Sequence, residues 1–134
     1  MATVQRLQHA SVPMPPGGQA EARRFYGAAL GLEEIPRPVD LQNLSLVWFR
    51  VGTDGQEVHC FAEERLGPNS PSQHLCLQVD DLAAFRARLA DHQVEIEETH
   101  PIHNRPRCFV RDPFGNQIEL TQIDGAYRPA DPHP

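Results

Sequence analysis

The sequence lacks the features of secreted, membrane-spanning and nucleic-acid-binding proteins. Its three cysteines, Cys60, Cys76 and Cys108, are odd in number and form no CxxC pair, which argues against a disulfide framework and a zinc ribbon. No apolar run approaches the roughly 20 residues of a membrane span, and the N-terminus has no signal-peptide pattern. The net charge of −6 disfavours nucleic acid and anionic membranes, which attract basic surfaces. We therefore expect a cytoplasmic protein with reduced thiols.

The length and composition fit one domain. The 134 residues have an apolar fraction of 40%, which is ordinary for a folded chain. We expect a single domain over residues 1–124, made of two halves at about 3–66 and 72–123. Residues 67–71 are expected to link the halves, and the proline-rich residues 125–134 to form a C-terminal tail without regular structure.

The hydrophobic pattern predicts the same order of elements in both halves. In the first half we expect a strand, a helix and two further strands at 3–12, 22–30, 44–51 and 56–63. In the second half we expect a strand, a helix and three strands at 73–79, 82–89, 94–98, 105–111 and 116–120. The chain is therefore interpreted as two copies of strand–helix–strand–strand–strand, with residues assigned to only two of the last three strands in the first copy.

Each predicted helix has one apolar stripe that needs a sheet to cover it. The first stripe comprises Ala22, Phe25, Tyr26, Ala29 and Leu30, and the second comprises Leu82, Phe85 and Leu89. Gly31 is placed to end the first helix, and Asp80 or Asp81 to cap the second.

Four polar residues recur at matching positions of the two halves. His9 and His74 each follow a glutamine near the start of a first strand, and His59 and Glu119 each lie four residues after a turn glycine. A phenylalanine, Phe49 or Phe109, precedes each of the latter two by ten residues. Because side chains of a strand alternate between faces, all four polar residues should lie opposite the apolar face.

Imidazole nitrogen and carboxylate oxygen are ligands for Zn, Ni, Fe, Mn or Co. Two or three histidines with one glutamate leave coordination positions open, as a catalytic metal requires. We predict a divalent metal site formed by His9, His74 and Glu119, with His59 as a fourth candidate ligand. The alternative for each of these residues is a structural or solvated position.

Three further groups of residues each allow two interpretations. Cys76 lies two residues beyond His74 on the same predicted face, where it either lines the site and meets an electrophile or is a small buried apolar group. His100 and His103 belong to a proline-flanked loop and are either surface residues or part of a lid. Phe109 is expected to line the substrate site. If it lies opposite Glu119, then three arginines that alternate along its strand lie on the same face, namely Arg105, Arg107 and Arg111. These arginines either bind an anionic substrate through two hydrogen bonds, with Arg107 the main candidate, or pair with Glu119 or contact solvent.

Four stretches of the chain resemble a known family. They are LQHASVPM at 7–14, ARRFYGAALGLEE at 22–34, QHLCLQVDDL at 73–82 and FVRDPFGNQIEL at 109–120. Together they resemble the vicinal oxygen chelate superfamily over residues 5–123. That superfamily includes glyoxalase I, methylmalonyl-CoA epimerase, extradiol dioxygenases, fosfomycin-modifying enzymes and bleomycin-sequestering proteins.

The resemblance implies an α+β fold in which two βαβββ modules form a cup-shaped mixed sheet. It implies metal ligands on the first and last strands of each module, and His9, His74 and Glu119 match those positions. Position 59 holds histidine where glyoxalase I has glutamate or glutamine. The resemblance also implies a homodimer.

The function expected from these observations is that of a metal-dependent enzyme acting on a small molecule with adjacent oxygens. Lyase, isomerase or epimerase, and ring-cleaving dioxygenase chemistry all fit, with Glu119 or a metal-bound hydroxide moving the proton. One alternative is a metal-free protein that sequesters a small molecule or antibiotic, as bleomycin-resistance proteins do. Another is a purely structural dimeric domain.

Overall fold

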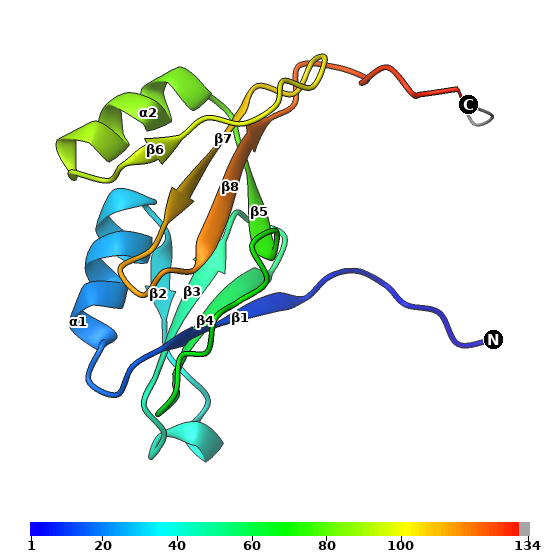
Figure 1. Cartoon of the computed structure of the whole chain (residues 1–134). Helices are drawn as coiled ribbons and strands as arrows, with labels where there is room; N and C mark the ends of the chain where they lie inside the picture. The colour runs from blue at the N-terminus through cyan, green and yellow to red at the C-terminus, as the bar shows by residue number, and fades with distance from the viewer. Residues whose placement is uncertain (132–134) are drawn as a thin grey trace. The chain divides into compact units, whose positions relative to one another are not determined.

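The computed structural model describes residues 1–131, which divide into two compact units. Unit 1 consists of Met1–Pro71 and Asp112–Asn116, and unit 2 consists of Ser72–Arg111 and the chain from Gln117 onward. Each unit has its own four-stranded sheet and its own helix (Figure 1). No helix in the described part of the chain is both long enough and apolar enough to cross a membrane.

Unit 1 has a mixed sheet in the order β1-β4-β3-β2, in which β1 and β4 are parallel and the other pairs are antiparallel. Its strands are β1 (His9–Met14), β2 (Glu33–Ile35), β3 (Leu46–Val51) and β4 (Gln56–Ala62). Its helical segments are α1 (Gln19–Ala22), the π-helical η1 (Arg23–Ala29) and the short 3₁₀ turn η2 (Val39–Leu41).

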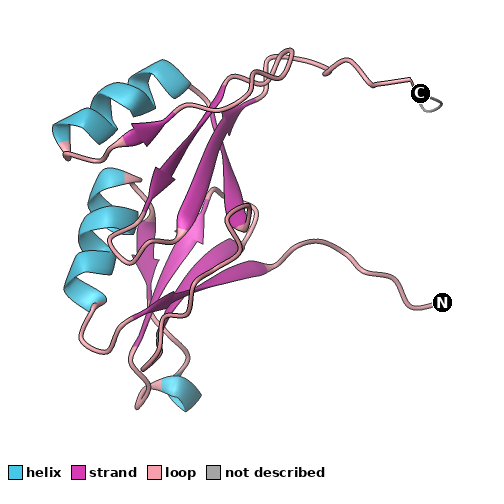
Figure 2. Cartoon of the chain, in the orientation of Figure 1, coloured by secondary structure: helices cyan, strands magenta, loops and turns pink. Residues whose placement is uncertain are grey.

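Unit 2 repeats this order, with its sheet arranged β5-β8-β7-β6 and with β5 and β8 parallel (Figure 2). Its elements are β5 (His74–Val79), α2 (Leu82–Asp91), β6 (Ile96–Glu97), β7 (Arg107–Arg111) and β8 (Gln117–Gln122). The expected α+β fold of two βαβββ modules is confirmed. From residue 123 to residue 131 the chain has no helix or strand.

The helix of unit 1 packs its predicted stripe on the sheet but is wound more widely than the pattern predicted. All five stripe residues are buried, and the Tyr26 ring lies 5.7 Å from that of Phe49 on β3. The amide of Leu30 donates to the carbonyl of Phe25, a five-residue separation that defines π-helical winding. Gly31 follows with φ of +75°, the left-handed conformation that ends a helix and favours glycine.

Helix α2 begins as its sequence predicts. The Asp81 carboxylate caps it by accepting a 2.9 Å hydrogen bond from the amide of Ala84. Leu82 and Leu89 are buried on the sheet side, while Phe85 is half-buried.

All seven predicted strands have somewhat different limits in the structure. The expected strand at 3–12 starts only at His9, because its partner β4 starts at Gln56 and offers no ladder to earlier residues. The strand expected at 105–111 starts at Arg107. The edge strand Glu33–Ile35 was not predicted, since two adjacent glutamates and three residues give no alternating pattern.

A buried hydrogen-bond network fixes the turn between β7 and β8. The Asp112 carboxylate accepts hydrogen bonds from the amides of Phe114 and Asn116, from the Asn116 side chain and from the Tyr26 hydroxyl, at 2.7–2.9 Å. The Asn116 side chain also donates to the carbonyl of Pro13. This network gives the Asp-Pro-Phe-Gly-Asn sequence a structural role, and all of it belongs to unit 1.

Candidate functional site

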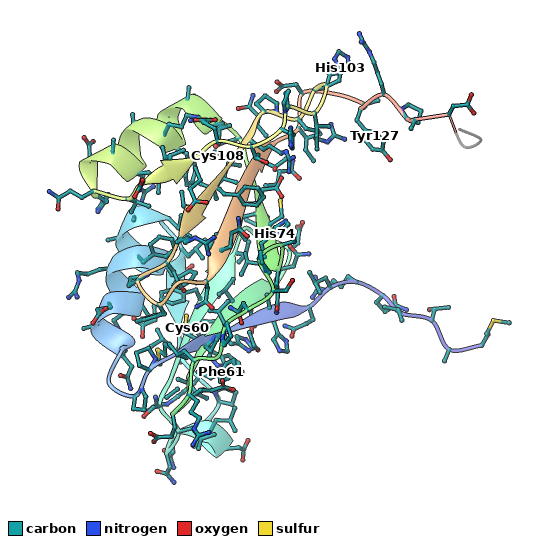
Figure 3. The ribbon with its side chains drawn as sticks, viewed as in Figure 1. Cys60, Phe61, His74, His103, Cys108 and Tyr127 are labelled. Carbon is teal, nitrogen blue, oxygen red and sulfur yellow. The ribbon has the colours of Figure 1, made fainter. Side chains whose placement is uncertain are left out.

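The strand registers of unit 2 place the predicted site residues on one face of its sheet. Cys76 on β5 and Phe109 on β7 both lie directly opposite Glu119 on the central strand β8. His74 is two residues before Cys76, so strand alternation puts it on the same face. Figure 3 labels His74 at the start of β5. Phe109 therefore lies opposite Glu119, which was the condition for placing it on the face of the site.

His74 and Glu119 are in direct contact. The Nε2 atom of His74 lies 2.9 Å from Oε2 of Glu119, and its Nδ1 atom lies 2.8 Å from the backbone carbonyl of Ser72. A carbonyl oxygen only accepts hydrogen bonds, so Nδ1 must carry a proton. In a neutral imidazole, Nε2 would then present a lone pair to the carboxylate. The contact is favourable only with a proton or a cation between the two atoms.

The second carboxylate oxygen of Glu119 is held by protein donors. Its Oε1 atom accepts a 2.7 Å hydrogen bond from the Thr121 hydroxyl and a 3.2 Å bond from Nη1 of Arg107. Burial alone would raise the pKa of this carboxyl group. The hydrogen bonds from Thr121 and Arg107, with the positive charge of Arg107 and the nearby His74, outweigh burial and hold the pKa below its ordinary value.

The three arginines of segment 105–111 have different surroundings. Arg107 contacts Glu119, and its Nε and Nη2 atoms both donate to the carbonyl of His100, at 3.2 and 3.0 Å. Arg105 lies before β7, where it binds the carbonyls of Asn104 and Gly125. Arg111 is exposed, with Nε 3.2 Å from a carboxylate oxygen of Glu97.

The cysteines differ in exposure. Cys60 and Cys108 are buried, each in the core of its own unit (Figure 3). Cys76 is exposed, so its interpretation as a small buried apolar group is wrong. Partial desolvation and the Glu119 charge raise the pKa of the Cys76 thiol, against the opposing effects of Thr121 and Arg107. His100 and His103 are exposed, which fits their surface reading.

Unit 1 repeats the ladder register of unit 2. His9 pairs with Glu57 as His74 pairs with Gln117, and Ser11 pairs with His59 as Cys76 pairs with Glu119. His9 therefore lies diagonal to His59, and their rings stack with centroids 4.2 Å apart. The residue opposite His59 is Trp48, whereas Phe49 pairs with Val58 in the core. The ten-residue spacing of Phe49 and Phe109 was therefore coincidental.

His59 is enclosed by its neighbours. The Trp48 ring stacks on it at 3.7 Å with an interplanar angle of 5°, and the His9 ring covers its other side. Its Nε2 atom lies 2.6 Å from a carboxylate oxygen of Glu57. Burial lowers the pKa of His59 and the neighbouring His9 adds to this, while Glu57 opposes both. As a metal ligand through Nε2, His59 would have to give up its contact with Glu57.

Each unit thus brings together one pair of predicted ligands, His74 with Glu119 and His9 with His59. Within either unit, residues 1–131 contain no group of three or more His, Cys, Asp or Glu side chains arranged to hold a metal ion. The His74–Glu119 pair fits a divalent ion. Two ligands about 2.1 Å from one ion, at right angles, lie about 3.0 Å apart, close to the observed separation.

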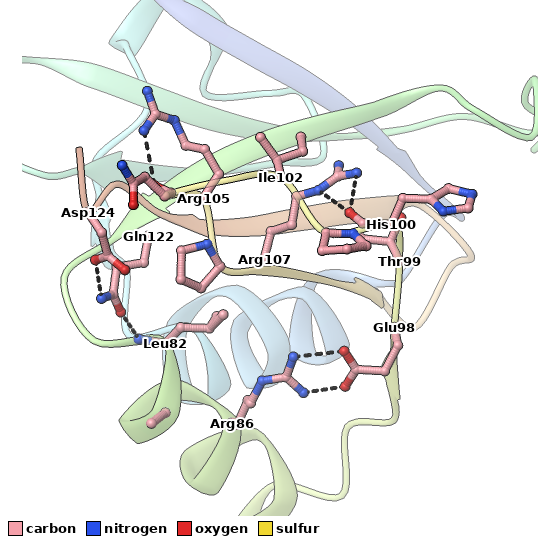
Figure 4. A pocket seen from close by; sticks show the side chains of 14 residues that line it. Leu82, Arg86, Glu98, Thr99, His100, Ile102, Arg105, Arg107, Gln122 and Asp124 are labelled. Atoms are coloured by element: carbon pink, nitrogen blue, oxygen red, sulfur yellow. Dashed lines mark hydrogen bonds and ion pairs between the residues drawn. The ribbon is translucent and has the colours of Figure 1, made fainter. Parts of the chain in front are cut away.

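A cavity of about 600 Å³ lies in unit 2 (Figure 4). It is bordered by α2, the segment 98–106, the start of β7 and the end of β8. Arg86 and Glu98 form a two-point ion pair on its wall, at 2.5 and 2.9 Å. Arg107 belongs both to this wall and to the surroundings of Glu119.

Two contacts at the site were not predicted from the sequence. Thr121 could have been found, because it lies two residues beyond Glu119 and strand alternation puts both on one face. The Ser72 carbonyl that orients His74 could not, because a backbone group has no sequence signal.

Comparison with known proteins defines the class. The family model for the Glyoxalase/Bleomycin resistance protein/Dioxygenase superfamily matches residues 6–120, and the chain belongs to this superfamily. Comparison with curated proteins gives no match.

Solved structures agree with this assignment. A Bacillus anthracis protein assigned to the glyoxalase family is 32% identical, with a TM-score of 0.83 over 92% of this chain and 98% of that one. A lactoylglutathione lyase from Agrobacterium tumefaciens is 23% identical, with a TM-score of 0.65 over 90% and 96%. A fosfomycin resistance protein from Listeria monocytogenes is 15% identical, with a TM-score of 0.71 over 89% and 91%. At these lower identities the likeness concerns the fold alone.

Proposed function

We propose that the protein is a metal-dependent enzyme that acts on a small molecule with adjacent oxygens, by lyase, isomerase or epimerase, or ring-cleaving dioxygenase chemistry. The observation that carries this proposal is the contact of His74 with Glu119. One nitrogen of His74 is fixed by the Ser72 carbonyl and one oxygen of Glu119 by Thr121 and Arg107. Such outer partners typically orient metal ligands and set the histidine tautomer.

The proposed ligands are His74 and Glu119, together with His9 and with His59 as a fourth candidate. The proposal that His9 and His59 are ligands rests on the sequence repeat and on the matching strand registers of the two units. The donor set of imidazole and carboxylate suits Zn, Ni, Fe, Mn or Co.

Bound to these ligands, the ion would supply Lewis acidity to the substrate oxygens. The chain's own residues would perform the remaining steps. The lowered pKa of Glu119 keeps its carboxylate ionised, and this carboxylate, or a metal-bound hydroxide, is proposed to accept and return the proton. Arg107 is proposed to bind an anionic part of the substrate, and Phe109 and Cys76 to line the site. Phe109 lies edge-on to His74, with ring centroids 5.0 Å apart.

A metal-free binding protein is the second candidate. The stacked rings of Trp48, His59 and His9 support it, because such a column could extend onto a flat ligand. Metal analysis of the purified protein separates the two functions. A stoichiometric metal that is lost in His74→Ala and kept in His103→Ala supports the enzyme. Equal metal content in both variants, or no metal affinity in the unaltered protein, supports the binder.

We further propose that the protein is a cytoplasmic homodimer. The free thiols of all three cysteines support the location. Light scattering coupled to size-exclusion chromatography would test the dimer, with a mass of 30 kDa expected from two 15.0 kDa chains.

A further inference from the structure

We propose that the substrate is a small carboxylic acid whose carboxylate binds the Nε–Nη2 edge of Arg107, in the place now taken by the carbonyl of His100. That the bound acid is a substrate rests on the proposed function. That its carboxylate binds the protein depends on Arg107 alone.

The guanidinium of Arg107 is largely buried, and its hydrogen-bond donors outnumber the acceptor oxygens that they contact. Its side chain is 16% exposed, and Nη1 is committed to Glu119. The Nε and Nη2 atoms converge on one neutral oxygen, that of His100. The planar fork of arginine matches the two oxygens of a carboxylate, and the resulting charge-assisted bonds are roughly twice as strong as neutral ones. A carboxylate would therefore be a better partner than the present carbonyl.

The carbonyl of His100 is also easy to displace. His100 and its neighbours Pro101 and Ile102 are exposed and lie outside the named strands. Along with Arg107 they line the cavity of about 600 Å³, which has room for a small acid (Figure 4). Movement of this segment would cost few buried contacts.

The neighbouring arginines lack this combination. Arg111 is exposed beside the Glu97 carboxylate, and Arg105 lies near the Tyr127 ring, 5.6 Å from its centroid. Arg107 alone of the three adjoins Glu119.

The test uses the full-length protein, pyruvate and its neutral analogue pyruvamide. In ¹⁵N-correlated NMR spectra, pyruvate should shift the Nε–H signal of Arg107 and the amide signals of His100 and Ile102, while pyruvamide should not. Arg107→Lys should weaken pyruvate binding about ten- to a hundredfold, because a single ammonium cannot replace the fork. Arg111→Lys, on the same strand, is the matched control and should bind as the unaltered protein does.

Equal shifts with pyruvamide, or pyruvate shifts confined to Arg111, would overturn the inference. The two-probe comparison needs no substitution, so it remains decisive if Arg107→Lys fails to fold. Metal affinity measured on the same samples separates this result from the proposed function. Charge-dependent binding at Arg107 without any metal affinity would uphold the carboxylate site and remove the metal chemistry.

Discussion

The hydroxyl of Tyr26 donates a 2.7 Å hydrogen bond to Oδ2 of Asp112, although the two residues lie 86 positions apart in the chain. Both are buried, and the carboxylate also receives three bonds from its own turn. A helix of the first module is thereby tied to the turn that joins the last two strands of the second.

Tyr26→Phe should destabilise the protein by about 1.5–3 kcal/mol, the usual range for a hydrogen bond to a charged group. Urea unfolding followed by circular dichroism would measure the change. Tyr127→Phe is the matched control, since Tyr127 is 58% exposed, and its free energy of unfolding should be unchanged. Equal stabilities for the two variants would show that the Tyr26 bond contributes nothing.

Stability should fall at alkaline pH. Burial, followed by the charge and hydrogen bond of Asp112, raises the pKa of Tyr26 well above 10, and burial raises the pKa of Cys60 to about 12. A pKa raised on folding gives stability that is complete below the unfolded value and is lost as pH rises toward the folded value. The free energy of unfolding should therefore decline from about pH 9 upward. A flat profile between pH 8 and 11 would contradict this assignment.

The thiols should react in two classes. At pH 8 a disulfide reagent such as DTNB should label one thiol, Cys76, because it is exposed, and more slowly than a small free thiol because its pKa is raised. Cys60 and Cys108 should react only after unfolding. Cys76→Ser should abolish the native signal, and labelling that persists in this variant would show that a buried cysteine is accessible.

Trp48 is the one tryptophan of the chain and reports on His59. His59→Ala should expose the indole face, shift its emission to longer wavelength and remove about 0.5–1.5 kcal/mol of stacking. His103→Ala, in an exposed loop, should leave the emission unchanged. Identical spectra for both variants would mean that the stack does not persist in solution.

Much of the site was predictable because its signals are local. The glutamines before His9 and His74, the turn glycines and the alternation of each strand were enough to place the residues on faces. The pairing of Phe109 with Glu119 followed from the short turn between them. These features depend on neighbours in the sequence and need no tertiary information.

The remainder depends on tertiary contacts. The helix at 23–29 has the apolar spacing of an α-helix, yet it is wound as a π-helix. Trp48 replaces Phe49 opposite His59 because the first hairpin differs from the second by one residue in register. The enclosure of His59 by Glu57 and two rings follows from that register and has no signature in spacing alone.

An anomalous diffraction map of crystals grown with the metal found in the purified protein tests the central claim most directly. The account predicts a peak about 2.0–2.2 Å from both Nε2 of His74 and Oε2 of Glu119, and its absence from crystals of His74→Ala. A peak that lies elsewhere in the molecule, or a proton-bridged His74–Glu119 pair without any peak, would contradict it.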